Sequence, residues 1–439
     1  MARFLHGVRL PHRKHTANQS AVRMDPPQFV TLSTSMHIGK PAVPCVKVGD
    51  HVYVGTRVAE QDGFISSPVF SSVSGTVKRL EETLTSAGKL VPAIVVESDG
   101  LMEPDPAIAP PTVNSREELV SAIRESGLVG LGGAAFPTYV KFHTDDPASL
   151  TDWVINGAEC EPYITSDSIG MVDRFEDIAL AIETVDRYFS FERILIGIEK
   201  NKPDAIRSMK RLEAINPKIR VCPLPSIYPQ GGEKVLVYHT TGKVIPLGKL
   251  PASVGCVVTN STTVATIGSY LRTGMPLVEK CVTVDGSAVK EPKNVIVPIG
   301  TSLSDLFAFA GGFTEDPGKV LYGGPMMGIA VPSLDAPVLK GTNAVLAFKE
   351  KDAKLPDPTP CIRCGRCTNV CPFGINPAEI AFAYKTDNME VMPKWGLTLC
   401  MECGCCSYVC PARRPLIQTN KLAKVAYKKY CEKEENKHE

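Results

Sequence analysis

Residues 361–372 read CIRCGRCTNVCP, and residues 400–411 repeat the pattern as CMECGCCSYVCP. Both runs have the spacing C-x2-C-x2-C-x3-C-P, which suits a cuboidal iron–sulfur cluster because a tight glycine-containing loop lets three thiolates surround one face. In two-cluster domains the fourth cysteine of each run ligates the other cluster. We therefore predict a helical domain over residues 355–418 that holds two [4Fe–4S] clusters.

The expected ligands form two crossed sets of four. The first cluster is assigned Cys361, Cys364, Cys367 and Cys410, and the second Cys400, Cys403, Cys406 and Cys371. Cys405 is out of register and is expected not to be a ligand. Paired cysteines can also hold structural zinc, but two complete runs, each followed by a proline, favour clusters.

The composition narrows the class of protein. Nine of the 15 cysteines lie between residues 361 and 410, a distribution that favours metal ligation in a reducing compartment over a disulfide scaffold. With 48 basic and 47 acidic residues, no overall field attracts nucleic acid. No apolar run approaches the roughly 20 residues of a membrane-spanning helix, so we expect a peripheral protein.

Changes in the pattern of apolar, glycine, proline and cysteine residues divide the 439 residues into four domains, an arm and a tail. The predicted segments are an N-terminal arm (1–28), a β domain (29–100), an α/β domain (113–265), a small β-grasp domain (266–350), the cysteine domain (355–418) and a C-terminal helix and tail (419–439). In the β domain, valines alternate with Gly-Asp turns, a pattern similar to the barrel-sandwich hybrids of lipoyl carriers. The carrier lysine is missing from the turn at residues 61–64, so we expect a structural role.

The α/β domain is expected to contain a parallel sheet. Apolar runs of strand length at residues 153–156, 193–198 and 219–222 are separated by helical patterns of about 10–15 residues. This alternation is typical of parallel strands with helices on both faces.

Four polar or glycine-rich segments lie in this domain. They are GLVGLGGAAFPT (127–138), NGAECEPY (156–163), YPQGGEK (228–234) and NSTT (260–263). Glycine loops allow backbone N–H groups to approach a phosphate closely, and ligands of α/β sheets bind where strands end. Glycine-rich turns are common, so each segment alone is a weak signal.

Together the four segments resemble those of the flavin- and NADH-binding subunit of respiratory complex I. The domain order, the N-terminal GVRLPHRKHTA and the ending CMECGCCSYVCPARRPLIQ resemble the C subunit of Rnf ion-translocating ferredoxin:NAD⁺ oxidoreductase complexes. The resemblance implies a multidomain α/β and α+β fold. Its parts would be a barrel-sandwich-hybrid-like β domain, a Rossmann-like FMN/NADH domain, an SLBB-like β-grasp domain and a ferredoxin-like two-cluster domain.

The resemblance also implies a role for particular residues. Gly130, Gly132 and Gly133 would hold the FMN phosphate region with Lys141 as the cation. Asn156 would hydrogen-bond the flavin, and Asn260 would act at the phosphate or ribityl side. Phe136 would stack on the adenine, Glu159 and Glu161 would line the nucleotide pocket, and Tyr228, Gly231 and Glu233 match the third segment. Two positions depart from the family pattern: Leu131 stands where the loop has arginine, and Ala158 where the second segment has its first acid.

The implied function joins hydride exchange between NAD(H) and FMN to one-electron transfer through the clusters, with no side chain acting as acid, base or nucleophile. The implied partners are other Rnf-type membrane and iron–sulfur subunits, with ferredoxin acting indirectly through one of them. Membrane partners would couple this reaction to Na⁺ or H⁺ transport, and the chain itself would lie peripherally on the cytoplasmic face of the membrane. The alternatives are a corrinoid reductase of similar make-up and a flavin-free electron relay or scaffold on a vestigial fold.

Overall fold

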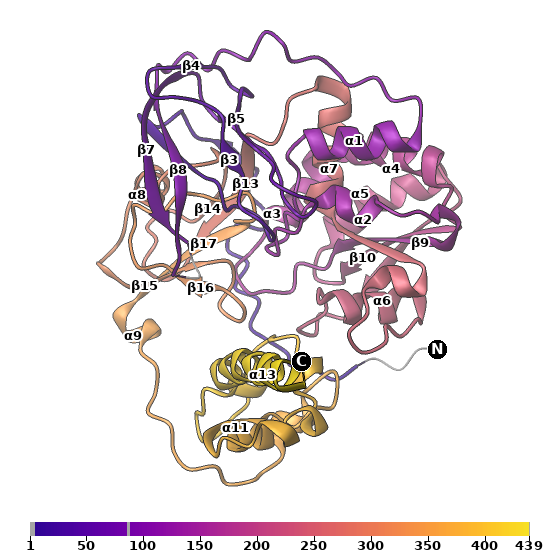
Figure 1. Ribbon diagram of the computed structural model, residues 1–439, viewed down its shortest axis with the longest axis vertical. Coiled ribbons are helices and arrows are strands. Elements are labelled where there is room, and N and C mark those ends of the chain that lie inside the picture. Colours follow the sequence, from indigo (N-terminus) through magenta and orange to yellow (C-terminus); the bar gives the residue numbers. More distant parts are fainter. Residues whose placement is uncertain (1–4, 86–87, 439) are drawn as a thin grey trace.

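The computed structural model describes residues 5–85 and 88–438, with the side chains of residues 436–438 excepted. Residues 1–4 of the predicted arm and residue 439 of the predicted tail lie outside this range. The β domain and the β-grasp domain lie beside the α/β domain, and the cysteine domain lies at one end, below all three in Figure 1. No helix in the described ranges is long and apolar enough to cross a bilayer.

The β domain consists of two small antiparallel sheets. The first has the order β2 (Phe29–Ser33), β8 (Leu90–Ser98), β7 (Gly75–Leu84) and β4 (His51–Val52); the second has β3 (Val43–Pro44), β5 (Arg57–Glu60) and β6 (Val69–Phe70). Alternate residues such as Val30, Leu32 and Ile94 are buried between the sheets. This period of two follows from strands with one face toward the core.

The predicted parallel sheet of the α/β domain is confirmed. Its strands have the order β11 (Ile219–Leu224), β10 (Arg193–Glu199), β9 (Asp152–Gly157) and β12 (Cys256–Asn260), all parallel. The helices are α1 (Arg116–Glu125), α2 (Thr138–Phe142), α3 (Ser166–Asp173), α4 (Phe175–Phe189), α5 (Pro203–Lys210), α6 (Glu233–Thr241) and α7 (Ser261–Thr273), with 3₁₀ turns at Pro147–Ser149, Arg211–Ala214 and Pro251–Val254.

Helices cover both faces of this sheet because the strands are apolar on both sides. Trp153 and Ile194 belong to the large core that includes α4 and α7. Val154 and Val258 point to the opposite face, where they pack with Leu236 of α6. The carboxyl ends of β9 and β12 lead directly into the second and fourth polar segments, as expected for ligand-binding loops of such sheets.

The β-grasp domain has one mixed sheet and two short helices. The strand order is β1 (Val22–Arg23), β14 (Lys293–Pro298), β13 (Glu279–Asp285), β17 (Ala344–Lys349), β15 (Pro317–Tyr322) and β16 (Ile329–Ala330); the helices are α8 (Leu303–Phe309) and α9 (Glu350–Ala353). The edge strand β1 comes from the N-terminal arm and pairs in parallel with β14. The arm thereby covers one open edge of the sheet.

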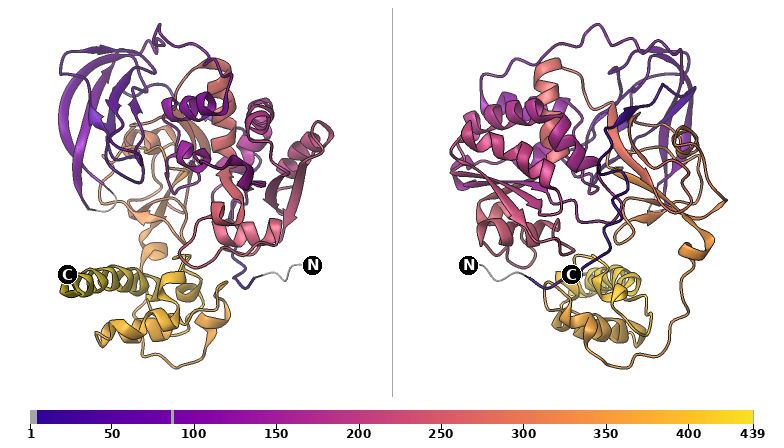
Figure 2. Two further views of the ribbon diagram at one scale, coloured as in Figure 1. Left: turned by 45° about the vertical axis from the view of Figure 1, so that its right-hand side comes forward. Right: turned by 180° about the vertical axis from the view of Figure 1, so that it is seen from behind.

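The arm also contacts the other domains on its way to β1. Val8 and Tyr228 exchange two backbone hydrogen bonds, of 2.8 and 2.9 Å. The Thr16 carbonyl accepts a hydrogen bond from the buried Asn294 side chain. Figure 2 shows this indigo segment running between the α/β and β-grasp domains. The arm therefore links the α/β and β-grasp domains, because its backbone groups form hydrogen bonds with both.

The cysteine domain is helical. It contains α10 (Arg366–Asn369), α11 (Pro377–Lys385), α12 (Cys405–Tyr408) and α13 (Leu416–His438), with 3₁₀ turns at Met389–Val391, Pro393–Trp395 and Leu397–Leu399. The final helix starts before the predicted C-terminal helix and tail (419–439): α13 begins at Leu416, and Ile417, Asn420 and Ala423 are buried. Its first two turns therefore form part of the packed domain, and only its later turns are mostly exposed.

Candidate functional site

The glycine loop between α1 and α2 is closed by its own backbone and open at its tip. Gly130 N–H donates to Phe136 O (2.8 Å), and Ala135 N–H donates to Gly130 O (3.0 Å). Gly132 and Gly133 are exposed at the tip. Gly133 has a φ of +113°, a conformation that side chains disfavour. Two exposed glycines therefore form the tip of the loop, and half-buried Phe136 follows them.

The loop lies against the start of α7. A Cβ on Gly132 would lie 3.0 Å from the Asn260 Nδ2 atom, so a side chain there would displace Asn260. Asn260 caps α7 by accepting hydrogen bonds from the backbone of Thr262 (3.0 Å) and Thr263 (3.3 Å), and its Nδ2 donates to Asp167 (2.7 Å). The fourth polar segment and the glycine loop are thus held together as one site.

This site has the donors that a phosphate requires. In the described ranges the N–H groups of Gly132 and Gly133 donate no hydrogen bond. The hydroxyls of Thr138 and Ser261, the first residues of α2 and α7, are buried and have no partner within the described chain. Buried hydroxyls are normally satisfied, and helix N-termini favour anions. The residues present therefore fit the phosphate of a flavin nucleotide.

The second and third segments meet beside this site. The Lys141 ammonium, on α2, donates to Val258 O (2.8 Å) and lies 3.4 Å from a Glu233 carboxylate oxygen. The Asn156 amide at the end of β9 donates to Gly231 O (2.9 Å). A Cβ on Gly231 would lie 2.5 Å from Ala158 O, so this approach requires glycine. Lys141, Asn156, Gly231 and Glu233 are brought together from distant parts of the sequence.

Glu159 and Glu161 lie in more enclosed surroundings than their predicted role implies. Glu159 accepts hydrogen bonds from Asp167 N–H (2.7 Å) and Ser168 Oγ (3.1 Å). Glu161 accepts from the backbone of Met326 (3.0 Å) and Met327 (2.8 Å) in the β-grasp domain. Burial raises the pKa of each carboxyl to about 7. Both residues therefore fix the acidic loop to its neighbours.

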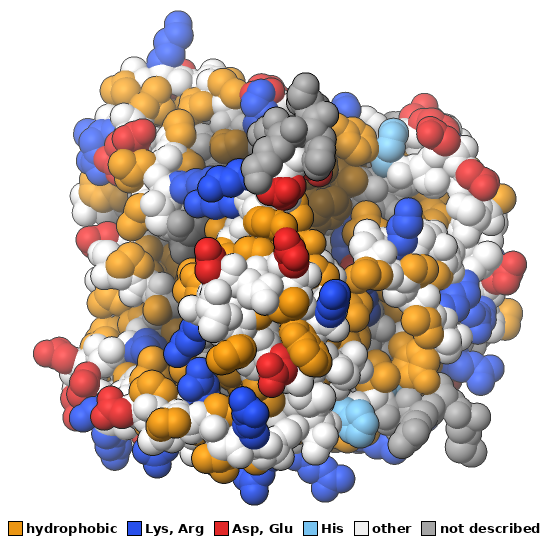
Figure 3. All heavy atoms as spheres, turned by 60° about the horizontal axis from the view of Figure 1, so that its bottom comes forward, with side chains coloured by type: hydrophobic (Ala, Val, Ile, Leu, Met, Phe, Trp, Pro, Cys, Tyr) orange, Lys and Arg blue, Asp and Glu red, His pale blue; other side chains and the backbone are white. Residues whose placement is uncertain are grey.

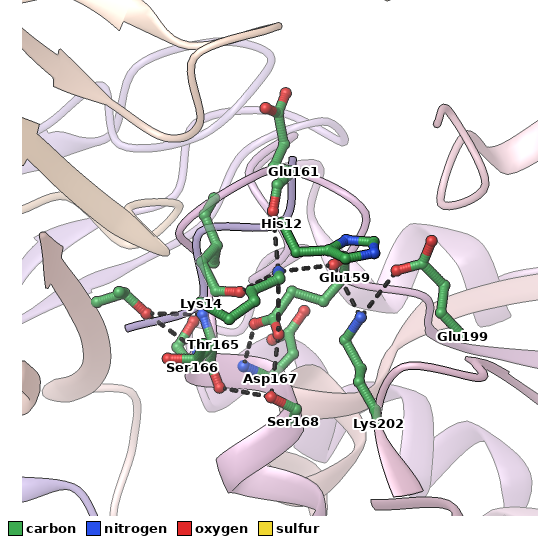
Figure 4. Close-up of polar contacts among 12 residues, drawn as sticks. His12, Lys14, Glu159, Glu161, Thr165, Ser166, Asp167, Ser168, Glu199 and Lys202 are labelled. Atoms are coloured by element: carbon green, nitrogen blue, oxygen red, sulfur yellow. Dashed lines mark hydrogen bonds and ion pairs between the residues drawn. The ribbon is translucent and has the colours of Figure 1, made fainter. Parts of the chain in front are cut away.

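Two lysines that sequence patterns did not single out hold the same loop. Lys14 of the arm donates to the carbonyls of Glu159 (3.0 Å) and Glu161 (2.9 Å), and burial lowers its pKa. Lys202 also donates to Glu159 O (3.0 Å) and to Glu199 (2.8 Å). Figure 4 shows these two side chains converging on the loop from opposite directions. Only tertiary contacts reveal them, because they come from segments far apart in the sequence.

The departures at positions 131 and 158 are buried. Leu131 is 1% exposed and belongs to the large core, and Ala158 packs in the smaller core beneath α6. Neither side chain can face a ligand in the open site. His143, which follows α2, is exposed and packs edge-on against Phe64.

The thiols of the first predicted cluster surround a hollow. Cys361, Cys364, Cys367 and Cys410 line one cavity of about 410 Å³, together with Gly365 and Arg366. Cys361 and Cys364 are exposed, so this hollow opens to solvent. Four convergent thiols around such a space fit a cuboidal cluster. No three His, Cys, Asp or Glu side chains within residues 5–85 and 88–435 are placed to hold a single metal ion.

The thiols of the second set gather inside the protein. Burial raises the pKa of Cys406 to about 12, with further contributions from neighbouring Cys400, Cys403 and Cys371. Cys371 thus lies with the second loop although it ends the first sequence run. Cys405 is buried beside them: its thiol lies 3.8 Å from Tyr228 O in the α/β domain and also contacts the Cys403 thiol.

This second loop is the contact with the α/β domain. The Tyr228 hydroxyl donates to Cys403 O (2.7 Å). Met401 lies so close to Gly232 that a Cβ there would overlap its methyl group, and Met326 of the β-grasp domain contacts Gly404. The turn that Asn156 holds at Gly231 is therefore continuous with the surface on which the second cysteine loop rests.

Four family models match successive parts of the chain. Residues 123–269 match the Nuo51 FMN-binding domain and residues 353–411 a 4Fe-4S dicluster domain. Residues 2–101 match the RnfC barrel sandwich hybrid domain and residues 281–330 the SLBB domain. The predicted multidomain fold class is confirmed, and the chain is an FMN and iron–sulfur protein.

Relatives match over nearly the whole length. The C subunit of the Na⁺-translocating ferredoxin:NAD⁺ oxidoreductase complex of Acetobacterium woodii is 39% identical, with 88% of each chain covered. Its counterpart in the proton-translocating complex of Clostridium ljungdahlii is 38% identical over 85% of this chain and 82% of the relative. The C subunit of the Rhodobacter capsulatus ion-translocating oxidoreductase complex is 38% identical over 99% and 84%. The chain belongs to this family, the C subunits of Rnf-type ion-translocating oxidoreductase complexes.

Proposed function

We propose that this chain is the NAD(H)-oxidoreducing subunit of an Rnf-type complex. It exchanges hydride between NAD(H) and FMN and passes single electrons between FMN and two [4Fe–4S] clusters. The contact that carries this proposal is the one between Tyr228 and Cys403, because it joins the flavin-binding domain directly to one cluster loop.

The chain's contribution at the flavin site is binding and orientation. Bound FMN supplies the exchange between two-electron and one-electron chemistry. The free N–H groups of Gly132 and Gly133 would hold the phosphate, with Lys141 as the cation, while Gly130 closes the loop through its own hydrogen bond to Phe136 O. Asn156, Asn260, Phe136, Tyr228, Gly231 and Glu233 would orient the flavin and the nicotinamide nucleotide. Glu159 and Glu161 would line the nucleotide pocket by holding its acidic loop in place. Enclosing the acidic loop between Lys14 and Lys202 keeps its backbone fixed.

The cluster ligands are proposed as two crossed sets. Cys361, Cys364, Cys367 and Cys410 hold the solvent-facing cluster, and Cys400, Cys403, Cys406 and Cys371 hold the cluster next to the α/β domain. The first four thiols line one cavity and the other four neighbour one another, which supports this assignment. The inner cluster is then the first to exchange electrons with FMN.

The remaining functions belong to partner subunits of the complex. Ferredoxin reacts indirectly, through a partner iron–sulfur subunit, and Na⁺ or H⁺ is moved by membrane partners. The chain is placed peripherally on the cytoplasmic face of the membrane, without nucleic acid as a partner. The names of its relatives, which describe ferredoxin:NAD⁺ oxidoreductase complexes that transport Na⁺ or protons, support this placement in the reaction.

Cofactor analysis and an NADH-to-viologen assay on the purified full-length chain test the proposal. We expect one FMN, two clusters and viologen reduction that requires both NADH and FMN. Iron and sulfide without flavin, and no NADH response after FMN is added, would instead indicate an electron relay or scaffold. Turnover with cob(II)alamin but not with viologen would indicate a corrinoid reductase. Either result would contradict the proposal.

A further inference from the structure

Lys280 is a buried cation that points at the glycine loop from another domain. It lies on β13 of the β-grasp (SLBB) domain, on the same face as Val282 and Val284, and is 4% exposed. Its ammonium donates to Leu131 O in the glycine loop and to Lys340 O (3.2 Å). Lys280 forms no ion pair in the described ranges, so its charge is satisfied by carbonyls and by the nearby charge of Asp167. A buried ammonium is costly unless its hydrogen bonds are satisfied, so these contacts hold Lys280 firmly against the loop.

The two hydrogen bonds of the Leu131 backbone fix the direction of the next peptide group. Leu131 N–H donates to Thr263 Oγ1 (3.0 Å) on α7, while Leu131 O accepts from Lys280. In a planar trans peptide the carbonyl and the following N–H point in opposite directions. Because Lys280 draws Leu131 O toward the SLBB domain, the Gly132 N–H is directed away from it, toward the exposed tip.

A second SLBB segment acts on the next peptide in the same sense. Asn343 Nδ2 lies 3.5 Å from Gly132 O, so the following Gly133 N–H is also turned outward. Gly341 fits against Ala135, where a Cβ would lie 3.0 Å from the alanine methyl. Both free amides of the loop tip thus owe their direction to the SLBB domain.

We propose that Lys280 is a positioning residue that holds the glycine loop with its amides facing the flavin phosphate, and supplies positive charge behind that loop. This inference rests on the proposed function. The side chain at position 131 is a buried leucine and brings no charge, whereas the Lys280 ammonium contacts the same peptide from behind. Amides aimed at an anion together with a fixed cation are the elements of a phosphate site.

Lys340 offers a matched control. It is equally buried in the same domain, and burial lowers its pKa to about 7, as it does for Lys280. Its ammonium donates to Ser67 Oγ (3.0 Å) and to Gly127 O (2.8 Å), before the loop tip. Substitution of Lys340 therefore removes a buried ammonium without releasing the Leu131–Gly132 peptide.

The test compares flavins with and without phosphate. The full-length chain is freed of flavin, and the affinities for FMN and riboflavin are measured by fluorescence quenching. In Lys280→Met we expect FMN binding to weaken by about tenfold or more, the effect of losing a charge-assisted hydrogen bond, and riboflavin binding to change by about twofold or less. Lys280→Arg should largely restore the preference for FMN. Lys340→Met should lower thermal stability but keep that preference.

Asn343→Leu, a half-exposed change, keeps the test decisive if Lys280→Met does not fold; we expect the preference for FMN to fall about threefold. An unchanged FMN-to-riboflavin ratio in the folded Lys280 variant, or in Asn343→Leu where that variant is the one measured, would overturn the inference. Equal loss of the ratio in Lys280→Met and Lys340→Met would also overturn it, by indicating general destabilisation. Failure of the unmodified chain to bind FMN would instead overturn the proposed function.

Discussion

The two cysteine loops have the same backbone and opposite surroundings. Gly365 and Gly404 both take positive φ, of +74° and +81°, so the loops turn alike. In the first, Ile362 is 67% exposed; in the second, Cys405 is 1% exposed and rests on the α/β domain. The end of the molecule that carries the cysteine domain shows lysine and arginine side chains along its rim (Figure 3). The motif predicts a cluster at each loop, whereas packing sets which loop rests on the α/β domain and which loop is exposed.

Replacing the fourth cysteine of either run by serine tests this comparison and should have the largest effect of the variants considered. Cys410→Ser should remove the outer cluster, and Cys371→Ser the inner one, because each thiol lies with the loop of the other run. Iron analysis should give a loss of up to about half the iron in each variant, and electron paramagnetic resonance should identify the missing signal. Loss of the inner signal in Cys410→Ser would disprove the crossed assignment.

Gly132→Val should prevent NADH from reducing the clusters at either cysteine loop, because it should remove FMN. The new side chain would collide with Asn260, so we expect FMN content to fall by about tenfold or more, a free-energy loss typical of overpacking a built site. Cluster absorbance in the same sample is the internal control and should not change. Normal flavin content in this variant would refute the assignment of the loop.

Tyr228→Phe tests the contact between the inner loop and the α/β domain. Removing the hydroxyl leaves Cys403 O without its 2.7 Å donor, at a cost of about 1 kcal/mol, so we expect electron transfer from NADH to viologen to slow roughly threefold to tenfold. Tyr322→Phe is the matched control, because its hydroxyl donates to Pro337 O within the SLBB domain. Equal slowing in both variants would show that the Tyr228 hydroxyl has no particular role in electron transfer.

Lys424→Met should have the smallest effect, and only on the inner cluster. The ammonium donates to Cys400 O (2.6 Å) and to Glu402 (2.8 Å), which offsets much of its charge. We expect the reduction potential of the inner cluster to fall by roughly 30 mV, about 0.7 kcal/mol for one electron. Lys428→Met, on the exposed part of α13, should leave it unchanged. A shift in the reduction potential of the outer cluster instead would mean that the inner and outer clusters have been assigned to the wrong loops.

Local sequence spacing predicts much of this molecule. The parallel sheet follows from apolar runs at fixed intervals, and the two cysteine sets follow from cluster geometry. The sequence indicates only weakly which cysteine loop is buried against the α/β domain. Position 366 is arginine in the first run, and its counterpart, position 405, is cysteine. A charged residue suits an exposed loop and a small apolar one a buried contact.

The contacts between domains are what spacing does not reveal. Lys14 and Lys280 act on loops about 150 residues away, so no local pattern marks their partners. Lys280 carries one trace of its role, since strand alternation places it inward with Val282 and Val284. The packed start of α13 was hidden because the many later lysines dominate the composition of the tail.

The order in which NADH reduces the two clusters tests the central claim most directly. Freeze-quenched samples of the FMN-loaded chain are examined by electron paramagnetic resonance after mixing with NADH, alongside Cys364→Ser and Cys403→Ser. We predict that the inner cluster is reduced first, that Cys364→Ser keeps this step, and that Cys403→Ser stops reduction of the outer cluster. Rapid reduction of the outer cluster in Cys403→Ser would contradict the account.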